Sequence, residues 1–154
     1  MKKIRYKTFE TNSSSVHTLQ YSDEVMDVIA SGLEPCNIPM NEEGKLVVDF
    51  GKCDKSGDFH DQYDKLSYLI TCLYYSAGMD FQTSYQFECL KEAVMKHEPS
   101  CTGIYVPFRH EAYIDHQSIP DYRDEFNGMC NIYDEDSVIN FVFNKNMYLH
   151  CDSD

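Results

Sequence analysis

The stretch YDKLSYLITCLYYSAG, residues 63–78, has the clearest periodic pattern in the chain and decides the class of fold. Its apolar side chains recur at the three- and four-residue spacing of one helix face, at Leu66, Leu69, Ile70, Leu73 and Ala77. Tyr63 and Tyr74 flank this stripe, and Gly78 ends it. The pattern predicts a helix with one buried face, and such a face needs other elements to cover it.

Further helices are predicted on both sides of this stretch. Ser22 caps a short predicted helix that ends at Gly32. A second main helix places Phe87, Leu90, Val94 and His97 on one face and is stopped by Pro99. The segment DEDSVINFVFNK, residues 134–145, predicts a last helix that one of its own acids caps, with Val138, Ile139 and Val142 inward.

Alternating or short apolar runs predict the strands. The runs KKIRYKTF and SVHTLQY alternate and predict two paired strands. The other predicted strands are residues 45–50, 101–108 and 111–118, with residues 147–151 as a short closing strand or tail. Paired neighbouring strands favour an α+β fold, in which a mixed, mainly antiparallel sheet packs against two main helices. A length of 154 residues suits a single domain, residues 1–154.

Seven cysteines, an odd number without any C-x-x-C pair, predict free thiols in a reducing compartment. No stretch reaches about 18 apolar residues, and no apolar signal-peptide core follows Met1, so we expect a cytoplasmic protein without a membrane partner. No zinc spacing, EF-hand loop or phosphate-binding loop occurs, so the sequence predicts no metal and no cofactor.

The net charge of −13 is unevenly distributed. Residues 1–20 carry four cations, Lys2, Lys3, Arg5 and Lys7, against Glu10, so the remaining residues carry −16. Such a chain repels nucleic acid and attracts basic partners. The carboxylates that could imitate phosphates are Asp54, Asp58, Asp61, Asp64, Asp121, Asp124, Glu125, Asp134, Glu135 and Asp136. A solvated surface, and for Asp61 and Asp64 the helix dipole, would also account for acids at these positions.

Short polar side chains cluster in the run TNSSSVH, residues 11–17. Asn12, Ser13, Ser14 and Ser15 suit a tight turn that closes a hairpin, and they also suit an anion site beside the basic strand. A serine close to His17 leaves nucleophilic catalysis open as a third interpretation.

A second polar run, YIDHQS, contains Asp115, His116 and Ser118. His17 and His116 could act as the acid and base of a phosphodiesterase. The H-x-S of residues 116–118 resembles one half of a two-histidine phosphoesterase, but Thr18 follows His17 directly, so the other half is missing.

Three segments together resemble a family. IRYKTFETNSSSVHTL, YIDHQS and VINFVFNKNMYLHCDSD are similar, in this order, to small proteins of phages, prophages and gut Firmicutes that have no established activity. The resemblance implies an origin in a mobile element and a bacterial host. It also implies that residues 12–15 and 17 form one site with Asp115, His116 and Ser118.

These observations favour a binding protein over an enzyme, since no catalytic motif is complete. We expect a phage accessory protein that inhibits a host defence nuclease, in the manner of an anti-CRISPR protein. Its acidic surface would imitate nucleic acid and occupy the basic nucleic-acid-binding cleft of a host protein, with no direct contact to nucleic acid. The alternatives are a small phosphodiesterase or nucleotide-processing enzyme that uses His17 and His116, and a structural protein of the virion or replication machinery.

Overall fold

The computed structural model describes the chain apart from residues 1–3, 11–15, 22–31, 50–56, 108–129 and 153–154. Its elements in chain order are β1 (Ile4–Glu10), β2 (Val16–Tyr21), β3 (Lys45–Val47), β4 (Gly57–Phe59), α2 (Gln62–Ala77), the 3-10 helix η1 (Gly78–Thr83), α3 (Tyr85–His97), β5 (Gly103–Tyr105), α4 (Glu135–Phe143) and β6 (Met147–Asp152). The predicted helix before Gly32 and the predicted strand at residues 111–118 lie outside the described residues.

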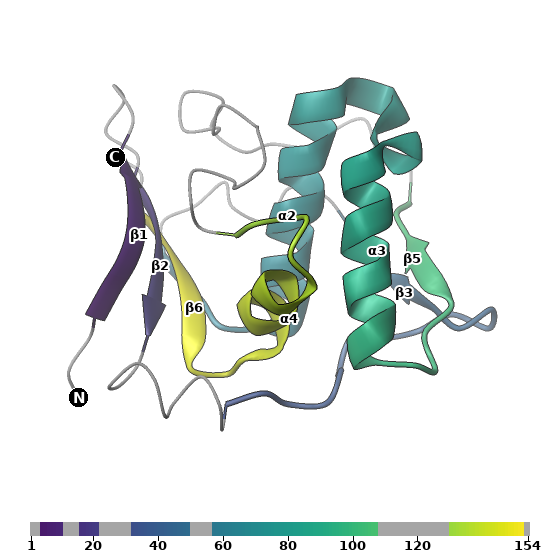
Figure 1. The fold of residues 1–154 in the computed structure, drawn as a ribbon, viewed down its shortest axis with the longest axis horizontal. Helices are drawn as coiled ribbons and strands as arrows, with labels where there is room; N and C mark the ends of the chain where they lie inside the picture. The colour runs from purple at the N-terminus through teal and green to yellow at the C-terminus, as the bar shows by residue number, and fades with distance from the viewer. Residues whose placement is uncertain (1–3, 11–15, 22–31, 50–56, 108–129, 153–154) are drawn as a thin grey trace.

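The helices form a layer between two small sheets (Figure 1). The sheet that contains β1, β2 and β6 lies on one side, α2 and α4 follow, and α3 lies between them and the β3–β5 pair. This arrangement confirms the α+β class, and it covers the apolar stripe of α2 with other helices.

The larger sheet is antiparallel and has the strand order β1-β2-β6-β4. The predicted pairing of the first two strands is confirmed, although their register shifts between Tyr6 and Thr8. Such an irregularity interrupts simple alternation between the two faces of a strand. Of the two interpretations of the closing segment, the strand is confirmed and the tail is not, because β6 lies between β2 and β4 and pairs with both.

The second sheet consists of β3 and β5, which pair in parallel with Leu46 opposite Ile104. Both of these side chains are buried, and α3 contacts β5. The strands expected at residues 45–50 and 101–108 are therefore present but short. They form a sheet of their own and do not join the antiparallel strands.

The core confirms most of the predicted helix stripe. Leu66, Leu69 and Ile70 are fully buried, and Leu73 is buried as well, whereas Ala77 is exposed. Tyr68 of α2 lies against Phe141 of α4, with ring centroids 6.4 Å apart. All three inward residues predicted for the last helix are buried: Val138, Ile139 and Val142.

Side chains cap the two later helices. Ser84 accepts a hydrogen bond from the backbone N–H of Phe87 at the start of α3. Asp134 accepts from the N–H groups of Asp136 and Ser137 at the start of α4, at 3.0 and 3.4 Å. The acid expected to cap the last helix is therefore Asp134.

Replacing this cap gives the first testable prediction. Asp134→Ala leaves two N–H groups of α4 without their acceptor and should lower the free energy of unfolding by about 1 kcal/mol. Asp134→Asn keeps an oxygen at the cap and serves as the matched control. Urea unfolding followed by circular dichroism measures both variants. Equal stability of the two would contradict the capping role.

Candidate functional site

The predicted serine–histidine site is only partly covered by the described residues. His17 lies in β2, where its backbone pairs with Phe9 of β1 and with Cys151 of β6. Asn12, Ser13, Ser14, Ser15, Asp115, His116 and Ser118 lie outside the described residues. The grouping of the two polar runs and the two-histidine phosphodiesterase therefore stay predictions.

The acidic candidates divide in the same way. Asp54, Asp121, Asp124 and Glu125 lie outside the described residues. Asp61 occupies the N-cap position of α2, and Asp64 lies in the first turn of that helix. Both positions favour a carboxylate because of the helix dipole. Asp58 of β4 contacts the imidazole of His150 in β6 at 2.6 Å, so this carboxylate connects two strands.

The third acidic group, residues 134–136, lies at the start of α4 and meets the last turn of α3. The Lys96 ammonium contacts the Glu135 carboxylate at 2.9 Å and that of Asp136 at 3.9 Å. The hydrogen bond to Glu135 raises the pKa of Lys96, and the charges of Glu135 and Asp136 raise it further. These carboxylates are therefore placed where they hold a cation.

Two tyrosines stack at the surface of the same pair of helices. The rings of Tyr85 and Tyr133 have centroids 5.6 Å apart and planes inclined by 26°. Tyr85 is 71% exposed and Tyr133 is 38% exposed. A hydrogen bond with Cys89 raises the pKa of Tyr85.

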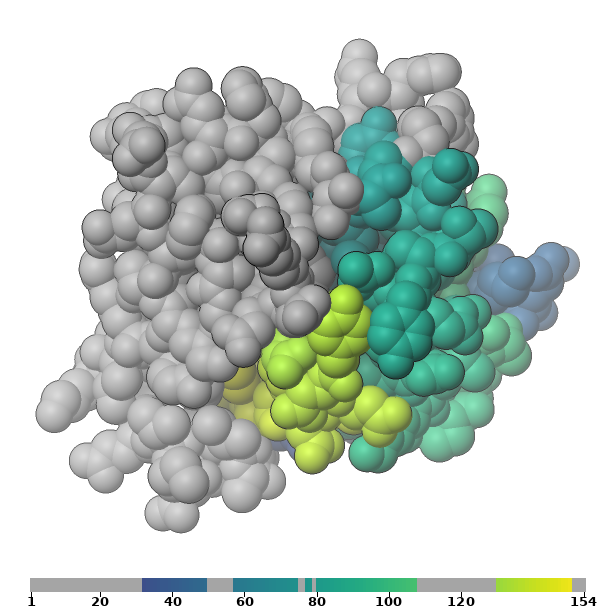
Figure 2. All heavy atoms as spheres, turned by 45° about the horizontal axis from the view of Figure 1, so that its top comes forward, coloured from purple at the N-terminus to yellow at the C-terminus, as the bar shows by residue number. Residues whose placement is uncertain are grey.

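We call this surface the tyrosine–carboxylate face. It comprises Tyr85, Glu92 and Lys96 of α3 together with residues 133–136 at the start of α4. Figure 2 shows the surfaces of α3 and α4 side by side. The sequence indicated the carboxylates but not the tyrosines, because nothing in the spacing of residues 85 and 133 shows that they meet.

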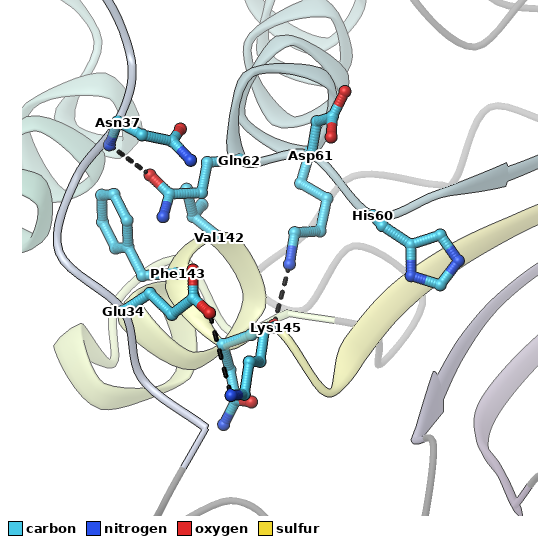
Figure 3. Close-up of a pocket in the computed structure, with 10 residues that line it drawn as sticks. Glu34, Asn37, His60, Asp61, Gln62, Val142, Phe143 and Lys145 are labelled. Atoms are coloured by element: carbon cyan, nitrogen blue, oxygen red, sulfur yellow. Dashed lines mark hydrogen bonds and ion pairs between the residues drawn. The ribbon is translucent and has the colours of Figure 1, made fainter.

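A small polar pocket of about 130 Å³ lies between the start of α2, the segment after Gly32 and the end of α4 (Figure 3). Gln62 is almost fully buried there. Its amide oxygen accepts from the N–H of Asn37, and its amide nitrogen donates to the carbonyl of Pro35. Lys145 and Glu34 face each other at 3.9 Å. These polar groups pair with one another and tie the segment after Gly32 to both helices.

Lys65 is the most unusual residue of the pocket, because its side chain is fully buried. Its ammonium nitrogen donates to the carbonyls of Asn144, at 3.0 Å, and Met147, at 2.8 Å. These carbonyls follow α4, which has no basic residue in its own last turn. Burial lowers the pKa of Lys65 to about 7, against the opposing effect of Asp61 and Glu34.

The hydrogen bonds of Lys65 indicate a structural role and not a catalytic one. An amine with a pKa near 7 can act as a nucleophile or a base. Here, however, the amine supplies donors to the chain between α4 and β6, and a reaction at the nitrogen would displace them. The sequence did not single out Lys65, because a lysine beside an apolar helix stripe is usually solvated.

Comparison with known proteins found no match: no family model, no curated protein and no solved structure matches the chain. Among the described residues, no group of three His, Cys, Asp or Glu side chains could hold a metal ion. In the same part of the chain, no helix is both long enough and apolar enough to cross a membrane. The cysteines at positions 36, 72, 89, 101 and 130 are free thiols.

Proposed function

We propose that this protein acts by binding and inhibits a host defence nuclease of bacteria. Its carboxylates would occupy the basic cleft in which the nuclease holds nucleic acid. The proposal rests on the net charge of −13 and on the ion pairs that the lysines form with acids of the same chain.

The observation that carries the proposal concerns the lysines whose side chains the structure describes: all of them apart from the buried Lys65 pair with acids of the same chain. The pairs are Lys45 with Glu43, Lys91 with Glu88, Lys96 with Glu135 and Lys145 with Glu34. Lys65 is the remaining lysine whose side chain the structure describes, and it is buried. The net charge of −13 therefore comes from carboxylates that outnumber the cations available to neutralise them.

The surplus carboxylates belong to separate elements of the structure. Glu42, Asp80 and Glu92 are exposed, at the turn before β3, in η1 and on α3 respectively. An excess of one sign spread over a small protein attracts a partner of opposite sign from a distance. A basic cleft that neutralises phosphates can neutralise these carboxylates by the same electrostatic attraction.

The proposal predicts salt-sensitive inhibition of nucleic-acid binding. The experiment adds the protein to purified RNA-guided nucleases and measures their affinity for target DNA at 50 and 300 mM salt. We expect the apparent affinity for DNA to fall at least about tenfold at 50 mM salt, and the inhibition to weaken strongly at 300 mM.

A charge variant supplies the matched control. Glu42→Gln, Asp80→Asn and Glu92→Gln together remove three exposed charges with little change in side-chain size, so the triple variant should inhibit more weakly. If the protein leaves DNA binding of every tested nuclease unchanged at low salt, the proposed function is wrong.

A further inference from the structure

The tyrosine–carboxylate face combines a pair of stacked, exposed tyrosine rings with carboxylates that bind a cation. Among the exposed large apolar or aromatic side chains of the described residues, Tyr85 has the highest exposed fraction, 71%. Its ring stacks on Tyr133, so the two rings are held together although both are exposed to solvent. Tyrosines of this kind are common in interfaces, because they contribute a large contact area and lose little conformational entropy on binding.

The carboxylates that follow Tyr133 in the chain already bind a cation of the same chain. Glu135 and Asp136 hold the Lys96 ammonium, whose side chain is 56% exposed. An exposed ion pair of this kind contributes little to stability. A second cation can therefore share these carboxylates with Lys96, or replace Lys96, at a low cost in free energy. Lys96 thus shows where the cationic group of a partner would lie.

The chemistry of the face favours arginine over lysine. A guanidinium group is planar, stacks on aromatic rings and donates to a carboxylate through two parallel N–H groups. A lysine ammonium can satisfy the carboxylates, but it offers no flat surface to the tyrosines. A nucleic-acid base could stack on the rings, but its phosphates would face Asp134, Glu135 and Asp136 and be repelled.

We propose that the tyrosine–carboxylate face is the surface that binds the partner, and that it takes arginine side chains of a basic protein segment. The rings of Tyr85 and Tyr133 stack on the guanidinium groups, while Glu135 and Asp136 accept their hydrogen bonds. The inference deepens the proposed function and rests on it, since the same basic cleft would supply the arginines.

The test compares octa-arginine with octa-lysine as probes, using isothermal titration calorimetry at 50 mM salt. The wild type should bind octa-arginine more tightly. Tyr85→Ala with Tyr133→Ala should weaken binding of octa-arginine about fivefold or more, and that of octa-lysine much less. Glu135→Gln with Asp136→Asn should weaken binding of both peptides.

Two matched variants distinguish an effect of this face from an effect of net charge and from an effect of the tyrosine hydroxyl groups. Glu42→Gln with Glu43→Gln also removes two negative charges, but at the turn before β3. This variant should weaken binding less than the change at Glu135 and Asp136. Tyr85→Phe with Tyr133→Phe keeps both rings and should retain the preference for arginine. Circular dichroism melting shows that each variant is folded.

The outcomes distinguish this inference from the proposed function. The assignment of this face would be overturned if the tyrosine-to-alanine variant lost the same affinity for both peptides. It would also be overturned if the double variant at Glu42 and Glu43 weakened binding as much as the one at Glu135 and Asp136. In that case salt-sensitive inhibition of a nuclease could still hold, with binding elsewhere. If the wild type inhibits none of the tested nucleases but still binds octa-arginine at this face, only the proposed function is overturned.

Discussion

The stability advantage of the wild type over Lys65→Met should increase as the pH rises from 7 toward 10.5. The folded state lowers the pKa of Lys65 to about 7, whereas the ordinary value is 10.5. Between these two values the unfolded chain binds more protons than the folded chain, so raising the pH favours the folded state. The slope from this one group is at most about 1.4 kcal/mol per pH unit.

The substitution has a second effect that does not depend on pH. Methionine fills a similar volume but donates no hydrogen bond, so the buried carbonyls of Asn144 and Met147 lose the donor that Lys65 supplies. The Asn144 carbonyl keeps the N–H of Met147 as a donor, so it is not left without a partner. The two lost hydrogen bonds are each worth about 1 kcal/mol, so at pH 9 we expect the variant to be less stable than the wild type by about 2 kcal/mol.

Urea unfolding of both proteins at pH 6, 7, 8 and 9 measures this difference. Tyrosines and cysteines elsewhere titrate in the same range, but they are common to both proteins and cancel in the difference. Below pH 7 the advantage of the wild type should be smallest, because burying the charged amine then works against the gain from its hydrogen bonds. Parallel stability curves for the two proteins would show that Lys65 does not titrate in this range.

Phe141→Ala should destabilise the fold by about 3–5 kcal/mol, because it removes a large buried ring from between helices. The Phe141 side chain is fully buried in α4 and lies against Tyr68 of α2. A loss of this size is a large fraction of the 5–15 kcal/mol that typically stabilises a domain.

Tyr85→Ala is the matched control, because it also removes an aromatic ring from a helix, but one that is 71% exposed. We expect it to change the free energy of unfolding by no more than about 0.5 kcal/mol. Thermal unfolding of both variants gives the comparison. A similar loss of stability in the two would mean that the ring of Phe141 does not support the core or that the ring of Tyr85 does.

The sequence predicted the elements whose pattern is local. The burial of Leu66, Leu69 and Ile70 follows from their spacing alone, because three or four residues bring a helix back to the same face. The capping role of Asp134 is local in the same sense, since it needs only the N–H groups that follow it. The α+β class followed from these elements and from the paired first strands.

The features that the sequence missed depend on distant partners. No strand was predicted at β4, because Gly57–Phe59 is short and becomes a strand only by pairing with β6. Lys65 is buried because it meets carbonyls 79 and 82 residues further along the chain. The stack of Tyr85 on Tyr133 likewise joins α3 to the turn before α4, which is distant in sequence. No local pattern encodes such contacts.

The position of β6 has a consequence for the order in which the protein can be built. This strand is the neighbour that the hairpin of β1 and β2 shares with β4, and it follows the other described strands in the sequence. During synthesis the hairpin and β4 therefore leave the ribosome well before the strand that joins them into one sheet. The antiparallel sheet can close only once Met147–Asp152 has been made, so its completion depends on contacts between strands that are far apart in the sequence.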